Sequence, residues 1–217
     1  MIISFANQKG GVGKSTHCAL FAHYLSEKEK VVHVIDMDYQ RSLKNKRQND
    51  TVSVSAKREG EEVVFDNTLN FSVDAVNPDN ILKFLDSAKT NEDAIYIFDT
   101  PGNLAHENVI KTLYLSDFII VPFNYTELRL DSTAIFVQIV QKFKIPAKLI
   151  FMPNDIDRRI KLDSAEKVNE IFCKMGVVAP ILYHYADIER FSTVEFNKRQ
   201  REVILPTYDF IYKQLTL

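Results

Sequence analysis

Apolar residues recur along the chain in short continuous runs, separated by longer stretches with helical spacing. The runs are rich in β-branched side chains and cover residues 2–6, 31–35, 95–98, 118–123, 149–152 and 177–182. Runs that are continuous rather than alternating predict strands buried on both faces. The helical stretches are residues 15–26, 80–88, 104–115, 127–143 and 163–175. This order predicts an α/β fold of three layers, in which helices flank a mostly parallel, twisted sheet.

The remaining segments give weaker patterns. Residues 52–56 and 71–76 are further strand candidates, and they flank a charged loop at residues 57–62. Residues 205–217 are apolar and aromatic with one lysine, Lys213. Because a helix on a membrane surface typically carries more positive charge, we expect this segment to pack against the domain. No repeat or linker interrupts the 217 residues, so we expect a single domain over residues 1–217.

Composition narrows the class of protein. Hydrophobic residues make up 46% of the chain and charged residues 26%, which is ordinary for a soluble globular protein. The chain has no apolar run of about 18 residues and no signal-peptide pattern, so we expect a cytoplasmic protein. A net charge of −2 excludes a globally basic nucleic-acid binder but not local basic patches. Cys18 and Cys173 form no CxxC pair, so we expect buried apolar roles rather than metal or redox chemistry.

A glycine-rich loop follows the first predicted strand and opens the first predicted helix. Its residues are Lys9, Gly10, Gly11, Val12, Gly13, Lys14, Ser15 and Thr16. Glycines let backbone N–H groups turn toward phosphate oxygens, and the start of a helix favours an anion. We expect Lys14 to neutralise the β- and γ-phosphates and the Ser15 hydroxyl to bind Mg²⁺. The simpler alternative is a strand-to-helix turn with solvated lysines.

Three aspartates follow predicted strands. Asp36 and Asp38 end the second strand with one residue between them, and we expect their side chains to point in different directions. One can hold a magnesium-bound water while the other reaches the water that attacks the γ-phosphate. We expect Asp36 to contact magnesium through water, with a strand-end cap as the alternative. Asp99 ends the apolar run 95–98, and we expect it to act on Mg²⁺ through water as well.

The loop from Lys9 to Ser15, preceded by Asn7 and Gln8, resembles the deviant Walker A loop of the ParA/MinD ATPases. The usual Walker A pattern has a glycine where this chain has Gln8, and the family instead has an early lysine. The resemblance implies that Lys9 crosses a dimer interface to the partner's nucleotide. It also implies that Asp38 serves hydrolysis, which makes Lys9, Lys14 and Asp38 the predicted catalytic residues. Tyr39 stands where the family usually has proline.

Two further segments extend the resemblance. Asn154 follows the strand 149–152, and the family's asparagine there binds an adenine edge. The spacing of Asn154 and Asp157 also fits the N-x-x-D pattern for guanine, and an Asx-turn is a third interpretation. We favour adenine because GTPases place lysine where this chain has Asp155. Residues 124–131, with Ser132 and Ala134, resemble a dimer-interface loop of small ParF-type partition ATPases.

The resemblance implies a switch that binds ATP/ADP and Mg²⁺ and forms a homodimer with ATP. Slow hydrolysis, stimulated by a partner protein, would time the segregation or positioning of plasmid, chromosome or mobile-element DNA. Nonspecific DNA contact would use basic residues, although solvated faces are an equal explanation. The three basic clusters are Arg41, Lys44, Lys46 and Arg47; Arg158, Arg159 and Lys161; and Arg190, Lys198, Arg199 and Arg201.

Three other functions use similar loops. A MinD-like ATPase would position complexes at a membrane, which the low positive charge of residues 205–217 disfavours. A ligase of the dethiobiotin-synthetase type would phosphorylate a small carboxylate and would work as a monomer. A nucleotide-gated scaffold would bind ATP without releasing phosphate.

Overall fold

Among the residues that the structure describes, a single sheet of seven parallel strands forms the centre of the molecule. The structure is a computed structural model, and it describes residues 1–58, 71–91, 93–159 and 165–216. The strand order is β3-β2-β4-β1-β5-β6-β7. The strands are β1 (Ile2–Phe5), β2 (Val31–Asp36), β3 (Ser72–Ala75), β4 (Ala94–Asp99), β5 (Phe118–Phe123), β6 (Lys148–Pro153) and β7 (Gly176–Val178).

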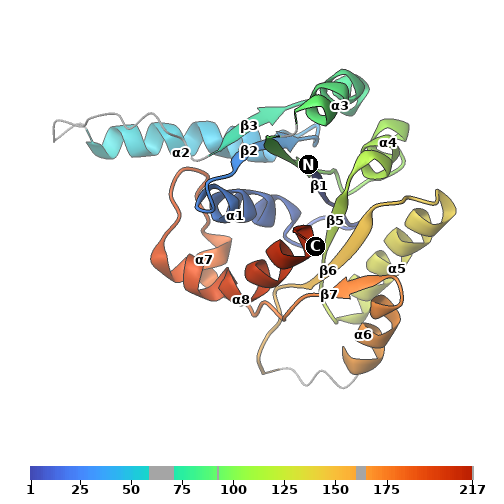
Figure 1. The fold of residues 1–217 in the computed structure, drawn as a ribbon. Helices are drawn as coiled ribbons and strands as arrows, with labels where there is room; N and C mark the ends of the chain where they lie inside the picture. The colour runs from blue at the N-terminus through green and yellow to red at the C-terminus, as the bar shows by residue number, and fades with distance from the viewer. Residues whose placement is uncertain (59–70, 92, 160–164, 217) are drawn as a thin grey trace.

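Helices cover both faces of this sheet (Figure 1). One face packs against α1 (Lys14–Ser26) and α8 (Lys198–Leu215), and the start of α2 (Ser42–Arg58) joins them. The other face packs against α3 (Ile81–Thr90), α4 (Glu107–Leu115), α5 (Glu127–Lys142) and α6 (Ala165–Cys173). A short 3-10 helix, η1 (Pro78–Asn80), precedes α3, and one helical turn, α7 (Ala186–Glu189), precedes α8. The three-layer α/β prediction is therefore confirmed.

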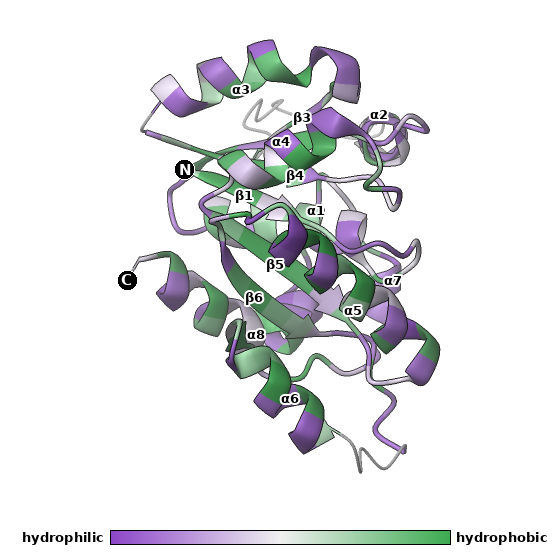
Figure 2. Ribbon diagram, turned by 90° about the vertical axis from the view of Figure 1, so that its right-hand side faces the viewer, coloured by the Kyte–Doolittle hydropathy of each residue, from purple (hydrophilic) through white to green (hydrophobic). Residues whose placement is uncertain are grey.

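Strand burial follows from the apolar runs. Every residue of β1, β4 and β5 is buried, and Figure 2 shows hydrophobic residues along β5 and β6. Side chains alternate between the two faces, so Ile3 and Phe5 join the α1 side while Ile2 joins the α4 side. Continuous hydrophobicity is what a strand covered on both faces needs.

Two strand predictions changed. β7 is shorter than the predicted run 177–182, and residues 52–56 belong to the helix α2 rather than to a strand. The alternation of valine and serine at 52–56 is typical of a strand, but Val52 is 68% exposed, and no strand in the described part of the chain pairs with this segment. Of the predicted charged loop, Lys57 and Arg58 end α2, and residues 59–62 lie outside the described residues. Residues 163 and 164 of another predicted helix also lie outside them.

The C-terminal segment packs against the domain, as predicted. Helix α8 begins with a capping box between Asn197 and Gln200, and its residues Ile204, Tyr208 and Ile211 are buried against the sheet and α1. The apolar face that a membrane-surface helix would turn toward lipid is therefore buried inside the domain. In the described part of the chain, no helix combines the length and the apolar character required to cross a bilayer.

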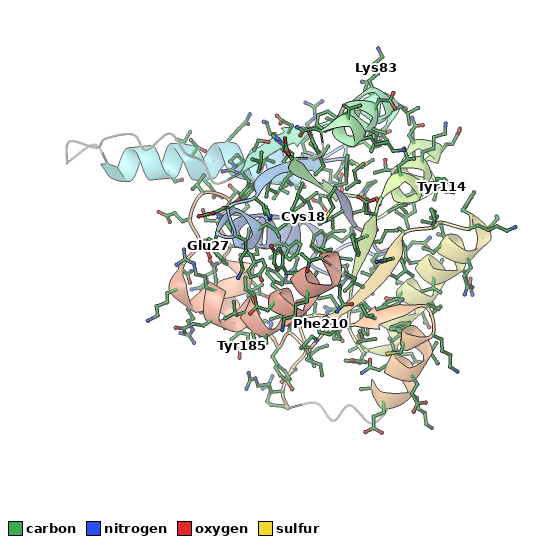
Figure 3. The ribbon with its side chains drawn as sticks, viewed as in Figure 1. Cys18, Glu27, Lys83, Tyr114, Tyr185 and Phe210 are labelled. Atoms are coloured by element: carbon green, nitrogen blue, oxygen red, sulfur yellow. The ribbon has the colours of Figure 1, made fainter. Side chains whose placement is uncertain are left out.

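The two cysteines differ in environment. Cys18 is buried on the sheet side of α1, as predicted, and Figure 3 shows it in the interior. Cys173 is exposed at the end of α6, so its predicted burial is wrong. Phe172, the neighbouring residue of the same helix, faces the core, so Cys173 points away from it.

Candidate functional site

The glycine-rich loop connects β1 to α1 at the carboxyl edge of the sheet. Gly11 and Gly13 have φ angles of 73° and 96°, which glycine adopts without strain. A Cβ atom at Gly13 would lie 2.5 Å from the side-chain nitrogen of Asn154, so this position also requires glycine for close approach. Gly13 is the N-cap of α1, and no side chain caps the helix. The first N–H groups of α1 are therefore available to an anion.

The two lysines of the loop point to different places. Lys14 is buried, and its Nζ donates a hydrogen bond to the backbone oxygen of Lys9 at 2.8 Å. Burial lowers the pKa of Lys14, and the nearby carboxylates of Asp99 and Asp38 oppose that shift. The Lys9 side chain leaves the loop instead, and its Nζ lies 3.5 Å from the backbone oxygen of Leu128 at the start of α5. Lys14 thus serves the loop of its own chain, whereas Lys9 reaches the molecular surface.

Asp99 and Ser15 form the part of the site suited to a hydrated Mg²⁺. Asp99 ends β4, is 2% exposed and accepts a hydrogen bond from the Ser15 side chain. Its Oδ1 has no hydrogen-bond partner among the described residues. Burial raises the pKa of Asp99 to about 7, and the charges of Asp36 and Asp38 add to the shift. A buried carboxylate oxygen without a partner, beside a serine hydroxyl, fits a hard cation that keeps its water ligands.

Asp36 has a clear structural task. Its Oδ1 accepts a hydrogen bond from the backbone nitrogen of Asp38 at 3.0 Å, and its Oδ2 accepts from those of Leu43 and Lys44 at 2.9 and 3.0 Å. Burial raises the pKa of Asp36, and these three hydrogen bonds counteract the shift. The carboxylate therefore caps the start of α2, in agreement with the strand-end alternative, and its contact with magnesium stays a prediction.

Asp38 follows Asp36 in the loop that leaves the same strand. It is half-buried, and its Oδ1 accepts a hydrogen bond from the backbone nitrogen of Gln40 at 2.9 Å. Asp38 is close enough to Lys14 and Asp99 for its charge to act on both of their pKa values. The different directions predicted for the Asp36 and Asp38 side chains stay a prediction, as does the role of Asp38 in hydrolysis.

A buried hydrogen-bond chain fixes the loop from behind. The Asn154 Nδ2 donates to the Val12 oxygen at 3.0 Å, so its Oδ1 is the acceptor for His17 Nε2 at 2.8 Å. His17 Nδ1 is then the acceptor for the Tyr208 hydroxyl at 2.7 Å. Burial lowers the pKa of His17 to about 4, which keeps the ring neutral, so that one ring nitrogen can donate and the other can accept a hydrogen bond.

These hydrogen bonds limit the further contacts that the Asn154 amide can make. Both polar atoms of its amide already have protein partners, so adenine binding by Asn154 stays a prediction. The guanine pattern gains no support, because the Asp157 carboxylate is paired with Arg159.

The sequence did not predict that His17 and Tyr208 support the loop. A histidine in the first turn of an otherwise apolar helix was the available signal for His17, but Tyr208 lies 191 positions away along the chain.

A cavity of about 180 Å³ opens beside the loop. Gly11, Gly13 and Thr16 line one side of it, and Asn154, Tyr183 and His184 line the other. The structure thus brings three of the predicted loop residues, Gly11, Gly13 and Thr16, to one cavity with Asn154. Gly10 is exposed and has open space beside its Cα, so it too can approach a ligand.

The basic clusters are largely paired within the chain. Arg47 is buried and donates to the Phe71 oxygen at 2.7 Å, so it anchors α2 instead of facing solvent. Arg199 and Arg201 on α8 form ion pairs with Asp187 and Glu27. Lys161 lies outside the described residues. DNA contact by any of the clusters stays a prediction.

A family model described as the CobQ/CobB/MinD/ParA nucleotide binding domain matches residues 3–195. The chain belongs to this family. The family prediction made from the glycine-rich loop is therefore confirmed. A comparison with curated proteins found no match.

Solved structures with the same fold include relatives of several functions. A plasmid partition protein of Borrelia burgdorferi B31 bound to AMPPNP matches with a TM-score of 0.70 and 21% identity, covering 98% of both chains. The ATP complex of a Cyanothece McdA variant gives 0.74 and 15%, covering 100% of this chain and 96% of its own. Cobyrinic acid a,c-diamide synthase of Mycobacterium smegmatis, with an ATP analogue and magnesium, gives 0.67 and 19%, covering 100% and 96%.

Proposed function

We propose that this ParA/MinD-family chain is a single-domain ATPase that dimerises with ATP and acts as a switch in the partition, segregation or positioning of plasmid, chromosome or mobile-element DNA. The observation that carries the proposal is the opposite placement of two lysines in one loop. Lys14 folds back onto the loop, while Lys9 extends toward α5 at the surface. An outward lysine beside a phosphate loop is suited to a nucleotide held by another copy of the chain.

The proposed cofactors are ATP or ADP with Mg²⁺. Backbone N–H groups from Gly11 to Ser15 and the Lys14 ammonium would hold the phosphates, and Ser15 and Asp99 would hold the hydrated ion. Bound Mg²⁺ would neutralise charge on the phosphates. The similar structures that contain AMPPNP, ATP, or an ATP analogue with magnesium support this choice. Asp38, half-exposed at the rim, is placed to orient a water and accept its proton.

The surface around Lys9 supports a dimer interface. Leu128, whose oxygen faces Lys9, is 74% exposed, and Ile135, about two turns farther along α5, is 45% exposed. Exposed large apolar side chains beside a functional lysine are typical of a surface that a partner covers. This agrees with the interface predicted for residues 124–131 with Ser132 and Ala134. A stimulating partner protein and nonspecific DNA complete the proposal.

A ligase is the second candidate, because the diamide synthase of Mycobacterium smegmatis shares the fold. A ligase would turn over as a monomer and would need a small carboxylate substrate. The packed α8 disfavours the third candidate, a MinD-like ATPase, because the apolar residues of that helix lie in the core. ATPase rate and oligomeric state, measured with and without nonspecific DNA, separate these functions. We expect DNA binding only with ATP, weakening as salt rises.

The role of Asp38 has its own test. We expect Asp38→Ala to retain ATP and accumulate the dimer, since the residue is proposed to act on water rather than on the nucleotide. Phosphate release should fall by about 10²- to 10⁴-fold, the usual contribution of a general base. Asp86→Ala, which removes an exposed carboxylate from α3, is the matched control. Loss of ATP affinity in Asp38→Ala alone would contradict the assignment.

A further inference from the structure

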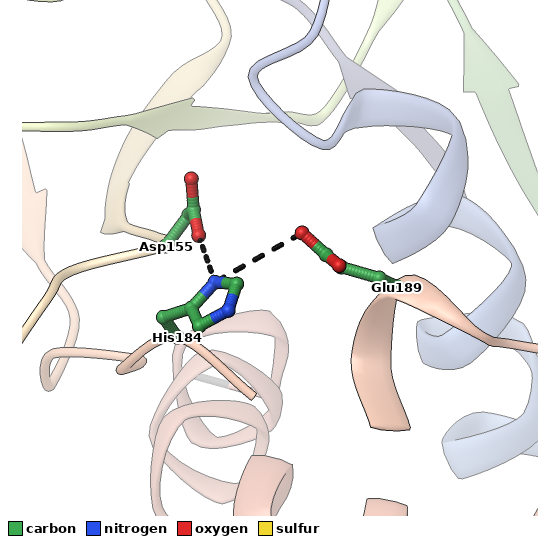
Figure 4. A group of neighbouring side chains, drawn as sticks. All are labelled: Asp155, His184 and Glu189. Carbon is green, nitrogen blue, oxygen red and sulfur yellow. Dashed lines mark hydrogen bonds and ion pairs between the residues drawn. The ribbon is translucent and has the colours of Figure 1, made fainter. Parts of the chain in front are cut away.

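Three potential metal ligands meet at the rim of the cavity, outside the phosphate loop. Asp155, His184 and Glu189 each offer one ligand atom, and these atoms lie within 4.8 Å of one another. Figure 4 shows the His184 ring between the two carboxylates, with its Nδ1 2.7 Å from Asp155 Oδ1 and 3.9 Å from Glu189 Oε1. Three ligand atoms this close together could hold one metal ion.

The backbone holds two of these residues together. Ile156 and Tyr183 form a parallel β-bridge, in which the Ile156 nitrogen donates to the Leu182 oxygen at 3.3 Å and the His184 nitrogen donates to the Ile156 oxygen at 3.0 Å. Asp155 adopts a φ of 58°, an unusual conformation for an aspartate that turns the chain directly after β6. The spacing between Asp155 and His184 is therefore set by the fold rather than by the side chains alone.

Arg129 orients the carboxylate of Asp155. Its Nη1 donates to Asp155 Oδ2 at 2.9 Å, which leaves Oδ1 for His184. Metal-binding carboxylates are commonly held by such an outer hydrogen bond. Glu189, the last residue of α7, is exposed and has no other ion-pair partner among the described residues. It can therefore turn toward an ion freely.

Carboxylates and arginines both lie near His184. The hydrogen bond to Asp155, followed by the charges of Asp155, Glu189 and Asp157, raises the pKa of His184. The positive groups nearby are Arg129, Arg159, which pairs with Asp157, and Arg158, which stacks over Tyr183 and Tyr185.

We propose that Asp155, His184 and Glu189 bind a divalent transition-metal ion, such as Zn²⁺ or Co²⁺, at the rim of the cavity. An imidazole nitrogen with two carboxylates suits these ions, whereas Mg²⁺ prefers oxygen ligands and keeps its waters. The ion would tie the end of β6 to α7 across one wall of the cavity that Gly11, Gly13 and Thr16 also line. It would be distinct from the magnesium proposed at Ser15 and Asp99.

Ion binding is tested without nucleotide, so that its outcome is independent of the proposed ATPase. The metal-free chain is titrated with Co²⁺ in excess Mg²⁺, the absorption bands of Co²⁺ are followed, and Zn²⁺ is then added as competitor. We expect one Co²⁺ per chain, displaced by Zn²⁺. His184→Ala and Glu189→Gln should each weaken binding by about tenfold or more. His106→Ala, which removes another histidine paired with an aspartate, Asp79, should bind like the wild type.

Wild-type binding no tighter than that of His184→Ala would overturn the site, as would equal loss in His106→Ala. Circular dichroism checks that the variants fold, and since His184 and Glu189 are both exposed we expect them to do so. A second arm, which rests on the proposed function, measures release of a fluorescent ATP analogue. Zn²⁺ should slow release from the wild type but not from His184→Ala. Equal release would overturn the coupling, and failure to bind the analogue at all would overturn the proposed function but not the ion site.

Discussion

At the scale of single residues, environment decides the role of chemically similar side chains. Lys9 and Lys14 belong to one loop, yet Lys14 is buried against the loop backbone and Lys9 reaches α5. Asp36 and Asp99 end neighbouring strands, yet both oxygens of Asp36 accept hydrogen bonds, from Asp38 and from the start of α2, whereas Asp99 keeps an oxygen without a partner among the described residues. The group with the unmet hydrogen-bonding capacity is the one we assign to the ion.

The burial of Asp99 should make stability depend on pH. Its pKa rises from 3.8 to about 7, so between these values the folded chain keeps a proton that the unfolded chain has released. The free energy of unfolding of the wild type, without Mg²⁺, should therefore fall as pH rises from about 4 to about 7. Asp99→Asn cannot ionise and should show a shallower fall. Urea unfolding across this pH range measures both.

Asp86→Asn is the control for that experiment, because it removes an exposed carboxylate and should keep the wild-type slope. Parallel curves for the wild type and Asp99→Asn would show that Asp99 is ionised at the same pH in the folded and unfolded chains.

The sequence predicted individual site residues where the chemistry is local. The glycine-rich loop and the strand-end aspartates are recognised because their neighbours along the chain define their surroundings. The predicted contact of Asn154 with a base stays a prediction, and the sequence did not indicate that its amide bonds to Val12 and His17. His184 was not predicted at all, because its contact with Asp155 depends on a β-bridge between Ile156 and Tyr183, which lie far apart along the chain.

At the scale of elements, α8 connects to the phosphate loop through α1. The Tyr208 hydroxyl on α8 bonds to His17, which bonds to Asn154, which bonds to the loop at Val12. Beside these hydrogen bonds, the Tyr208 ring packs against the Phe21 ring of α1 at a centroid distance of 5.0 Å. A movement of α8 would therefore change the hydrogen bonds that support the glycine-rich loop.

Removal of one hydroxyl tests this connection. Tyr208→Phe leaves His17 Nδ1 buried without a donor, so we expect a loss of roughly 1–3 kcal/mol in the free energy of unfolding. Nucleotide affinity should also fall, because Asn154 and Val12 lose part of their support. Urea unfolding and nucleotide titration provide the two measurements. Tyr212→Phe, on the same helix, should change neither, since its hydroxyl makes no hydrogen bond among the described residues. If both variants behave alike, the hydroxyl of Tyr208 has no such role.

Element prediction succeeded where burial is uniform and failed where it is not. Strands covered on both faces leave continuous apolar runs, so β1, β4 and β5 were predicted from hydrophobicity alone. Helix α2 buries little: it packs against the core near Leu43 and is mostly polar farther along, so the alternation at 52–56 resembled a strand. Its start depends on the Asp36 cap, a contact across seven or eight positions that a local pattern does not contain.

At the scale of the whole molecule, the parallel sheet gathers the site at one edge. The glycine-rich loop follows β1 at the centre of the sheet, with β4 and Asp99 on one side and β5 on the other. Ligands of open parallel sheets bind beyond the carboxyl ends of the strands, and here the same edge also leads to Lys9 and the exposed residues of α5. One surface therefore joins the nucleotide site to the proposed dimer interface.

The most direct test of this account is the mass of the chain in solution with ATP and Mg²⁺, measured by sedimentation for the wild type and Lys9→Ala. We predict a dimer for the wild type and for the control Lys213→Ala, which removes an exposed lysine from α8. Lys9→Ala should remain a monomer, although its unfolding free energy should stay within about 0.5 kcal/mol of the wild type. A Lys9→Ala chain that dimerises with ATP as readily as the wild type would contradict the central claim.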